Sequence, residues 1–161
     1  MIDITLRWIE RMVKELDIKG SALDIGSLDV NGNPKKFFKK YVGVDMQFGD
    51  NVDIVCNADD LQDIFPEKSF DVVLCLNVFE HVCNFDKILE NVKYLLKDGG
   101  YFFISVPSIA FPLHEYPSDY WRFTKAAVDE RLLDGYDILY SKLRRTKQNK
   151  HWIIDALGQK K

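Results

Sequence analysis

Ala22-Leu23-Asp24-Ile25-Gly26 is the stretch that decides the fold of this chain, an apolar strand that runs directly into a glycine turn. A second apolar run, Tyr41-Val42-Gly43-Val44-Asp45, ends in a carboxylate. Asp45 follows Asp24 by 21 residues, close to the roughly 20-residue spacing at which nucleoside-binding βαβ units place an acid for the ribose hydroxyls. The two stretches therefore predict a βαβ unit that binds a nucleoside cofactor.

The bulk properties narrow the class of protein. A length of 161 residues predicts a single domain over residues 1–161. The net charge of −3 gives no electrostatic reason to expect a nucleic-acid partner. No apolar run is long enough to cross a bilayer, and the N-terminus has no signal-type region, so we expect a cytoplasmic protein without a membrane partner. Cys56, Cys75 and Cys83 lack metal-ligand spacing and are interpreted as reduced, mostly buried thiols.

Helices and strands are predicted to alternate over the first half of the chain. Apolar residues at helical spacing (Leu6, Ile9, Val13, Leu16) predict a first helix. Asn33-Pro34 resembles a helix start, which predicts a short helix over Lys35–Lys40. A weak third strand is predicted at Val52–Val55. The nearly continuous apolar run at residues 70–76 is typical of a strand buried on both faces of a parallel sheet.

The second half of the chain predicts two capped helices and three more strands. Asn84 can cap a helix that Gly99-Gly100 would end, and a strand then runs through residues 101–106. Thr124 can cap the next helix, with Gly135 after it. No helix-length pattern separates Tyr136–Tyr140 from Trp152–Leu157, so these two strands should be antiparallel. The basic run of Lys142, Arg144, Arg145 and Lys147 between them is interpreted as a solvated hairpin turn.

Together these elements predict an α/β fold: a doubly wound, Rossmann-like, mostly parallel sheet of seven strands with an antiparallel pair at its C-terminal edge. The glycine turn then restricts the cofactor. A dinucleotide-binding turn needs glycines where this chain has Leu28 and Asn31, and Asp29 would repel a phosphate. No phosphate-binding loop is present either. The turn therefore favours a nucleoside cofactor without phosphates over a nicotinamide dinucleotide, and it disfavours a nucleotide-linked oxidoreductase.

Five motifs occur in order, at residues 22–27, 43–45, 57–61, 70–82 and 95–100. In this order they resemble the class I S-adenosylmethionine-dependent methyltransferases, specifically their compact, type-11-like small-molecule group. The resemblance covers about Ser21 to Thr124. The chain departs from the family pattern at Leu28, where a second glycine is common.

The resemblance implies S-adenosylmethionine as cofactor and assigns residues to its parts. Asp24, Gly26 and Ser27 match the motif that meets the methionine part, and Asp45 matches the acid that binds the ribose hydroxyls. Ala58 and Asp59 occupy the turn where an acid meets the adenine amine, although Asp60 stays open as the acid. Asn77 and Val78 end the fourth strand and would face cofactor and substrate.

The segment from Pro107 to Thr124 is unusually rich in aromatic and ionisable residues, and it follows the fifth strand on the ligand-binding side of the sheet. It is either a substrate wall or a hydrophobic cluster beneath a long loop. In the first interpretation, His114 and Asp119 are candidate proton acceptors and Arg122 binds an anion. His81 is a further catalytic candidate, with a packing role left open. Adjacent residues do not share a helix face, so Glu80-His81 predicts no metal site.

The resemblance implies a methyltransferase that transfers a methyl group to an O, N or C atom of a small molecule. His114 or His81 would act as general base if the acceptor needs one. The alternative is a catalytically inactive, methyltransferase-like binding module or partner subunit. Little of the chain remains to build a cap, so we expect an open site whose substrate is partly exposed or held by a second subunit, and a homodimer stays open.

Overall fold

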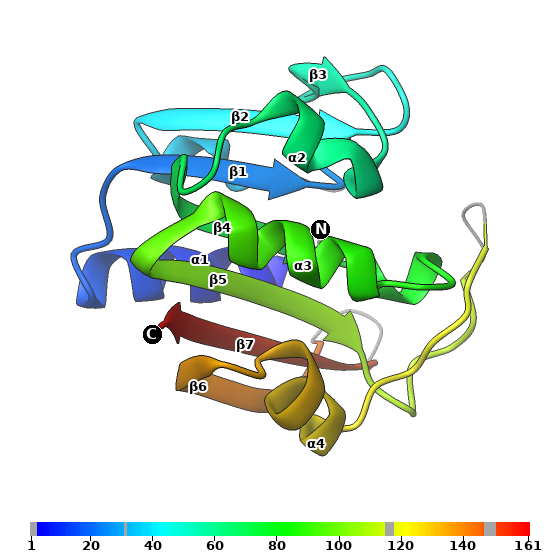
Figure 1. The fold of residues 1–161 in the computed structure, drawn as a ribbon. Helices are drawn as coiled ribbons and strands as arrows, with labels where there is room; N and C mark the ends of the chain where they lie inside the picture. Colours follow the sequence, from blue (N-terminus) through cyan, green and yellow to red (C-terminus); the bar gives the residue numbers. More distant parts are fainter. Residues whose placement is uncertain (1–2, 31, 115–117, 147–150) are drawn as a thin grey trace.

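The computed structural model describes residues 3–30, 32–114, 118–146 and 151–161. It contains a seven-stranded sheet with the strand order β3-β2-β1-β4-β5-β7-β6 (Figure 1). The strands are β1 (Ser21–Ile25), β2 (Lys40–Asp45), β3 (Ile54–Val55), β4 (Phe70–Leu76), β5 (Leu96–Pro107), β6 (Tyr136–Arg145) and β7 (Trp152–Lys160). The first five pair in parallel, and β7 is antiparallel to both β5 and β6. The predicted fold class and the antiparallel edge pair are confirmed.

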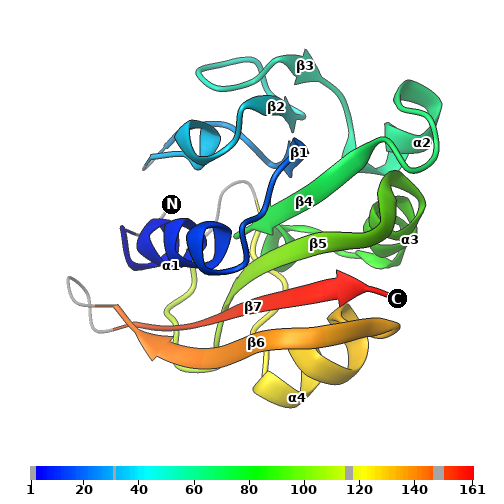
Figure 2. The ribbon, with the colours of Figure 1, turned by 90° about the vertical axis from the view of Figure 1, so that its left-hand side faces the viewer.

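Helices cover both faces of the sheet. They are α1 (Asp3–Glu15), α2 (Leu61–Ile64), α3 (Asp86–Leu95) and α4 (Lys125–Ala127), and α4 continues as a π-helical turn, η4 (Val128–Leu132). Three 3-10 turns accompany them: η1 (Lys35–Phe37), η2 (Ala58–Asp60) and η3 (Phe79–His81). Figure 2 shows α1 on one face of the sheet, with α2, α3 and α4 on the other. No helix in the described part of the chain is long and apolar enough to cross a membrane.

Two hydrophobic clusters hold these layers together. The larger one joins α3 and the turn after α4 to the sheet through residues such as Phe79, Val92 and Phe102. The smaller one places α1 on the opposite face, where Trp8 packs on Phe103 with ring centroids 5.4 Å apart. Burying this much apolar side-chain surface is the main force that fixes the layers.

The first helix exists, but its buried stripe differs from the predicted one. Thr5, Trp8, Ile9 and Met12 are the buried residues, whereas Leu16 is 38% exposed. The large ring of Trp8 decides this orientation, because it occupies the space against Phe103 of β5.

The predicted helix over Lys35–Lys40 is wrong. A 3-10 turn ends at Phe37, and β2 already begins at Lys40, so too few residues remain for an α-helix. The predicted stop at Gly99-Gly100 is also wrong. Helix α3 ends at Leu95, and both glycines lie within β5. The third strand is shorter than predicted and comprises Ile54–Val55 alone.

The predicted cap at Thr124 agrees with the structure, whereas the N-cap position of α3 is Phe85, one residue after the predicted Asn84. Asn84 Oδ1 accepts a hydrogen bond of 3.1 Å from the Asp86 amide at the start of α3. Thr124 caps α4 by accepting one from the Ala127 amide.

The basic run is not a solvated turn. Lys142, Arg144 and Arg145 lie in β6, while Lys147 lies outside the described residues. Arg144 Nη1 donates a 2.9 Å hydrogen bond to the buried Asp155 of β7, which also accepts from Thr5 and Ser105. Strand pairing explains the difference, because it carries β6 and β7 beyond the predicted ends.

Candidate functional site

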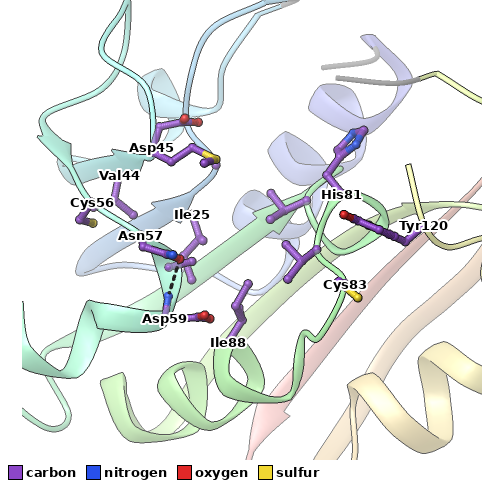
Figure 3. A pocket seen from close by; sticks show the side chains of 15 residues that line it. Ile25, Val44, Asp45, Cys56, Asn57, Asp59, His81, Cys83, Ile88 and Tyr120 are labelled. Atoms are coloured by element: carbon purple, nitrogen blue, oxygen red, sulfur yellow. Dashed lines mark hydrogen bonds between the residues drawn. The ribbon is translucent and has the colours of Figure 1, made fainter. Parts of the chain in front are cut away.

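A cleft of about 280 Å³ opens at the carboxyl ends of β1, β2 and β4 (Figure 3). Open α/β sheets bind ligands at this edge. Its apolar walls come from Ile25, Val44, Val78, Val82 and Ile88. Its polar lining comes from Asp45, Asn57, Asp59, His81 and Tyr120, with Asp45 on one side and His81 and Tyr120 on the other.

The floor of the cleft requires a glycine at position 26. Gly26 has φ +74°, a left-handed conformation that side chains disfavour. A β-carbon there would also lie 2.3 Å from Cγ2 of Val78, which is far inside van der Waals contact. The turn after β1 and the turn after β4 can meet only because residue 26 has no side chain.

The altered part of the glycine motif faces away from the cleft. Leu28 packs against Gly49, where its Cδ1 lies 2.4 Å from the place a β-carbon would take. Asp29 accepts hydrogen bonds of 2.6 Å from the Gly32 amide and from the Asn33 side chain. Neither Leu28 nor Asp29 lines the cleft, and Asn31 lies outside the described residues. The missing second glycine therefore leaves the cleft unobstructed.

Asp45 places its carboxylate in the cleft while its two oxygens order the surrounding loops. Oδ2 accepts from the Leu28 amide at 3.2 Å, and Oδ1 accepts from the Gln47 amide at 2.9 Å. Each carboxylate oxygen can accept two hydrogen bonds, so both keep one lone pair for a ligand. Two neighbouring hydroxyl groups are a matching ligand.

The turn after β3 forms the opposite wall. Asn57 Oδ1 accepts a 3.1 Å hydrogen bond from the Asp59 amide, which begins η2 (Figure 3). The buried Asn91 of α3 donates to the carbonyls of Ala58 at 2.7 Å and Asp59 at 3.0 Å. Ala58 and Asp59 line the cleft, whereas Asp60 does not. The structure thus favours Asp59 over Asp60 as the acid in this wall.

Three predicted cofactor residues lie near the cleft without lining it. Ser27 is buried and donates to the Asn51 carbonyl at 3.1 Å. Asn77 adopts φ +57°, and its amide donates to the Ser105 carbonyl at 2.8 Å. Asp24 is buried behind the turn and accepts a 2.5 Å hydrogen bond from the Tyr41 hydroxyl. These contacts shape the turns around the cleft.

Burial dominates the electrostatics of Asp24. It raises the pKa of the carboxyl to about 7, although the hydrogen bond from Tyr41 acts in the opposite direction. Its Oδ1 atom has no hydrogen-bond partner among the described residues.

Glu80, His81 and His114 converge at the rim of the cleft. The Nε2 atoms of both histidines lie 3.8 Å from Oε1 of Glu80, which is completely buried. The two imidazole rings stand edge to face with centroids 5.0 Å apart. Glu80 and His81 are neighbours in the turn η3, and their side chains nevertheless meet, contrary to the expectation drawn from helix faces.

Burial also sets the charge state of this cluster. It raises the pKa of Glu80 to about 8, with the nearby negative Asp119 adding to the effect. Burial lowers the pKa of His114, and the neighbouring His81 and Arg122 act in the same direction.

The segment after β5 is tied together by Arg122. Its guanidinium donates to the carbonyls of Phe111 and Pro112 and forms an ion pair with Asp119. The ion pair with Arg122 is the main reason that the pKa of Asp119 falls to about 2. Arg122 is therefore committed to internal contacts and not placed to bind an anion, and Asp119 lies behind His114 as a weak base.

Aromatic residues anchor the same segment to η3. The Tyr120 amide donates to the Glu80 carbonyl at 2.7 Å, and Trp121 Nε1 donates to the Val82 carbonyl at 2.8 Å. Phe123 packs on Phe85 with ring centroids 5.9 Å apart. The segment is a packed cluster, as one interpretation expects, and Tyr120 also lines the cleft. Its role as a substrate wall stays a prediction.

Several lining residues were not singled out from the sequence: Met46, Asn57 and Ile88. Tyr120 belongs to the segment interpreted as a possible substrate wall. Asn57 carried a usable signal, since an Asn two residues before Asp59 is a typical turn cap. Asn91 carried none, because its partners lie more than 30 residues away in the chain. The rim is open as expected, with Met46 66% and Tyr120 51% exposed.

Comparison with protein families decides the assignment. Residues 3–152 match the family described as methyltransferase domain. The chain belongs to this family. The match spans the whole cleft, from the Gly26 turn to the histidines of the rim, and confirms the resemblance to class I S-adenosylmethionine-dependent methyltransferases.

One curated relative matches part of this methyltransferase domain. An uncharacterised protein of Methanocaldococcus jannaschii is 34% identical over 79 residues, which cover 48% of this chain and 35% of that protein. The chain thus matches about a third of that relative's length.

The fold recurs in solved methyltransferases of low sequence identity. The 1,6-didemethyltoxoflavin-N1-methyltransferase of Burkholderia thailandensis, with bound 1,6-didemethyltoxoflavin and S-adenosylhomocysteine, has a TM-score of 0.80 at 18% identity, covering 97% of this chain and 78% of that one. A SAM-dependent methyltransferase of Archaeoglobus fulgidus has a TM-score of 0.65 at 13% identity, with 96% and 94% coverage. S-adenosylmethionine is the cofactor that this family uses.

Proposed function

We propose that this chain binds S-adenosylmethionine in the cleft and transfers its methyl group to an O, N or C atom of a small molecule. One observation carries the proposal: the Gly26 floor, the Asp45 carboxylate and the Asp59 turn all line one cleft. The domain family and the S-adenosylhomocysteine bound to the Burkholderia neighbour support it.

The chemistry of the lining fits this cofactor. Asp45 has two free lone pairs for the ribose hydroxyls, and Asp59 is an acceptor for an adenine amine. The walls of Ile25, Val44 and Ile88 are apolar, as a flat purine ring requires. Gly26 and Val78 would face the methionine part, with Asp24, Ser27 and Asn77 ordering the turns behind it.

When bound, the cofactor supplies a methyl group that its sulfonium already makes electrophilic. The chain has to hold the acceptor in line and exclude water, and positioning of this kind supplies up to several kcal/mol. A hydroxyl or protonated amine would also have to lose a proton. We propose His81, which lines the cleft, and His114 beside it as the acceptors of that proton, with Asp119 orienting His114.

The proposal also covers the domain organisation, location and partners of the chain. We propose that residues 1–161 act as one domain in the cytoplasm on a small-molecule substrate, without a nucleic-acid or membrane partner. The open rim leaves room for a substrate that a second copy or a partner subunit helps to hold.

Calorimetric titration with S-adenosylmethionine and S-adenosylhomocysteine tests the proposal. Asp45→Asn removes a charged acceptor, and hydrogen bonds to charged groups contribute about 1.5–3 kcal/mol, so its affinity should fall by roughly 10- to 100-fold. Asp50→Asn is the matched control, because Asp50 is exposed in the same loop and does not line the cleft. If the wild-type chain binds neither compound at millimolar concentration, the chain is an inactive binding module or partner subunit and the proposal fails.

A further inference from the structure

The cluster of Glu80, His81 and His114 offers one ligand atom from each residue, and the three atoms lie within 4.8 Å of one another. We infer that this cluster is a binding site for a divalent first-row transition metal ion such as Zn²⁺, at the rim of the cleft. The inference concerns metal binding alone and does not depend on the proposed methyl transfer.

Glu80 gives the first reason. Glu80 is 0% exposed, and neither of its carboxyl oxygens, Oε1 and Oε2, has a hydrogen-bond partner among the described residues. Burying a carboxylate without a partner is costly, and proteins normally pair such a group or let it bind a metal. Two imidazoles present nitrogen atoms 3.8 Å from Oε1.

The tautomer of His81 suits a metal ligand. Its Nδ1 lies 2.6 Å from the Ser118 carbonyl oxygen, which can only accept, so Nδ1 carries the proton. The Nε2 atom is then unprotonated and keeps its lone pair toward Glu80. Metal-binding histidines typically donate their second N–H to a backbone carbonyl or carboxylate in this way.

His114 has the same arrangement with a carboxylate behind it. Its Nδ1 lies 3.3 Å from Oδ2 of Asp119 and 3.4 Å from Nη2 of Arg122. Both protons of that Nη2 are already donated, one to Pro112 and one to Asp119. Nδ1 therefore carries the proton toward Asp119, and Nε2 is free to bind a metal, as in carboxylate–histidine–zinc arrangements.

The three ligand atoms lie within 4.8 Å of one another and must move closer together to hold one ion. Zinc binds imidazole nitrogen at about 2.0–2.1 Å, which places neighbouring tetrahedral ligand atoms roughly 3.4 Å apart. The Nε2–Oε1 distances of 3.8 Å exceed this by a few tenths of an ångström. His114 is 40% exposed at its side chain and lies in a surface segment, so it has room to close this gap.

The donor set indicates the class of ion. Two imidazoles and one carboxylate suit Zn²⁺ and neighbouring transition metals, whereas Mg²⁺ and Ca²⁺ prefer oxygen ligands alone. Three protein ligands leave at least one position open. A bound ion would occupy both Nε2 atoms, so proton acceptance by His81 and His114 belongs to the metal-free chain.

Metal titration of the full chain, freed of metal with a chelator, tests the inference. We expect one Zn²⁺ per chain by calorimetry. His81→Asn, His114→Asn and Glu80→Gln should each weaken binding by about 10- to 100-fold or more, the range seen even for residues behind the ligands. His151→Asn is the matched control, because His151 is the third histidine and packs on Phe111 outside the cluster. It should bind Zn²⁺ as the wild type does.

A second measurement covers variants that fail to fold. In wild-type protein, Zn²⁺ should shift the Nε2 resonances of His81 and His114 in histidine ring NMR spectra and leave those of His151 unchanged. Co²⁺ should give the absorption of a nitrogen- and oxygen-ligated site without a thiolate band from Cys56 or Cys83. No binding at millimolar Zn²⁺, a thiolate band, or equal binding by all four variants would overturn the inference.

Discussion

Gly26 and Val78 are in direct contact at the base of the cleft, and a β-carbon on residue 26 would lie 2.3 Å from Cγ2 of Val78. This contact joins the carboxyl ends of the two central parallel strands, β1 and β4. It explains why the glycine matters here for close packing as well as for its left-handed backbone.

Gly26→Ala should therefore both destabilise the fold and block the cofactor. The left-handed conformation costs about 1–2 kcal/mol, and overpacking against Val78 adds roughly 1–3 kcal/mol. Gly99→Ala is the control, since Gly99 has nearly the same φ of +75° but its β-carbon would meet no atom closer than 4.0 Å. Urea unfolding and S-adenosylhomocysteine titration compare the two variants. Equal losses of stability would show that the Val78 contact has no effect.

The order of the strands along the chain could be predicted from the sequence because each buried strand is a distinct apolar run, and the hydrogen bonds of the Asn84 and Thr124 side chains to nearby helix amides are local signals. The short connections could not be predicted as well. Asn33-Pro34 resembles a helix start, but the early beginning of β2 leaves room for a 3-10 turn only. Gly99-Gly100 resembles a helix stop, but pairing with β4 and β7 draws that region into the sheet.

In the site, too, residues placed by a single strand end could be predicted from the sequence, whereas contacts between distant residues could not. Asp45 ends β2 and Asp59 lies in the turn after β3, so their positions at the cleft follow from the topology. The role of Arg122 depends on a folded loop, and the convergence of Glu80 with His114 joins residues 34 positions apart. Neither arrangement leaves a periodic pattern in the chain.

Asp24 predicts how the stability changes with pH. Burial raises its pKa from 3.8 to about 7 in the folded chain, so the folded state holds this proton more tightly than the unfolded state does. The free energy of unfolding should consequently fall as the pH rises from about 4 to about 7, with a contribution of roughly 4 kcal/mol.

Asp24→Asn isolates this contribution, because the amide oxygen can still accept from Tyr41 and no charge is buried at high pH. Relative to the wild type, the variant should gain stability as the pH rises through this window. Buried groups such as Asp155 and Glu80 titrate in both proteins and cancel in the comparison. Urea unfolding at several pH values measures the difference. A difference that stays constant with pH would contradict this assignment.

Asn91 should affect cofactor binding without contacting the cofactor. Asn91→Ala removes the donor that holds the Ala58 and Asp59 carbonyls and should cost about 1–3 kcal/mol of stability. The loosened turn should also weaken S-adenosylhomocysteine binding. Glu90→Ala, at an exposed position of the same helix, is the control and should change neither. Unchanged affinity in the Asn91 variant would mean that the turn holds its shape by other contacts.

Arg122 should act as a structural clamp. Arg122→Lys keeps the positive charge but cannot reach the Phe111 and Pro112 carbonyls and Asp119 together, because lysine lacks the planar fork of donors. Hydrogen exchange should become faster in the segment that follows β5, while exchange in β1 and β4 stays slow. Arg131→Lys, on an exposed ion pair with Asp86, should leave the segment unchanged. Unaltered exchange in the Arg122 variant would contradict the clamp.

A crystal structure of the chain soaked with S-adenosylhomocysteine would show whether the cleft binds the cofactor. We expect the ligand in the cleft between Gly26 and Ala58, with both ribose hydroxyls within hydrogen-bond distance of the Asp45 carboxylate. An empty cleft at saturating ligand, or a ligand whose ribose does not contact Asp45, would contradict this expectation.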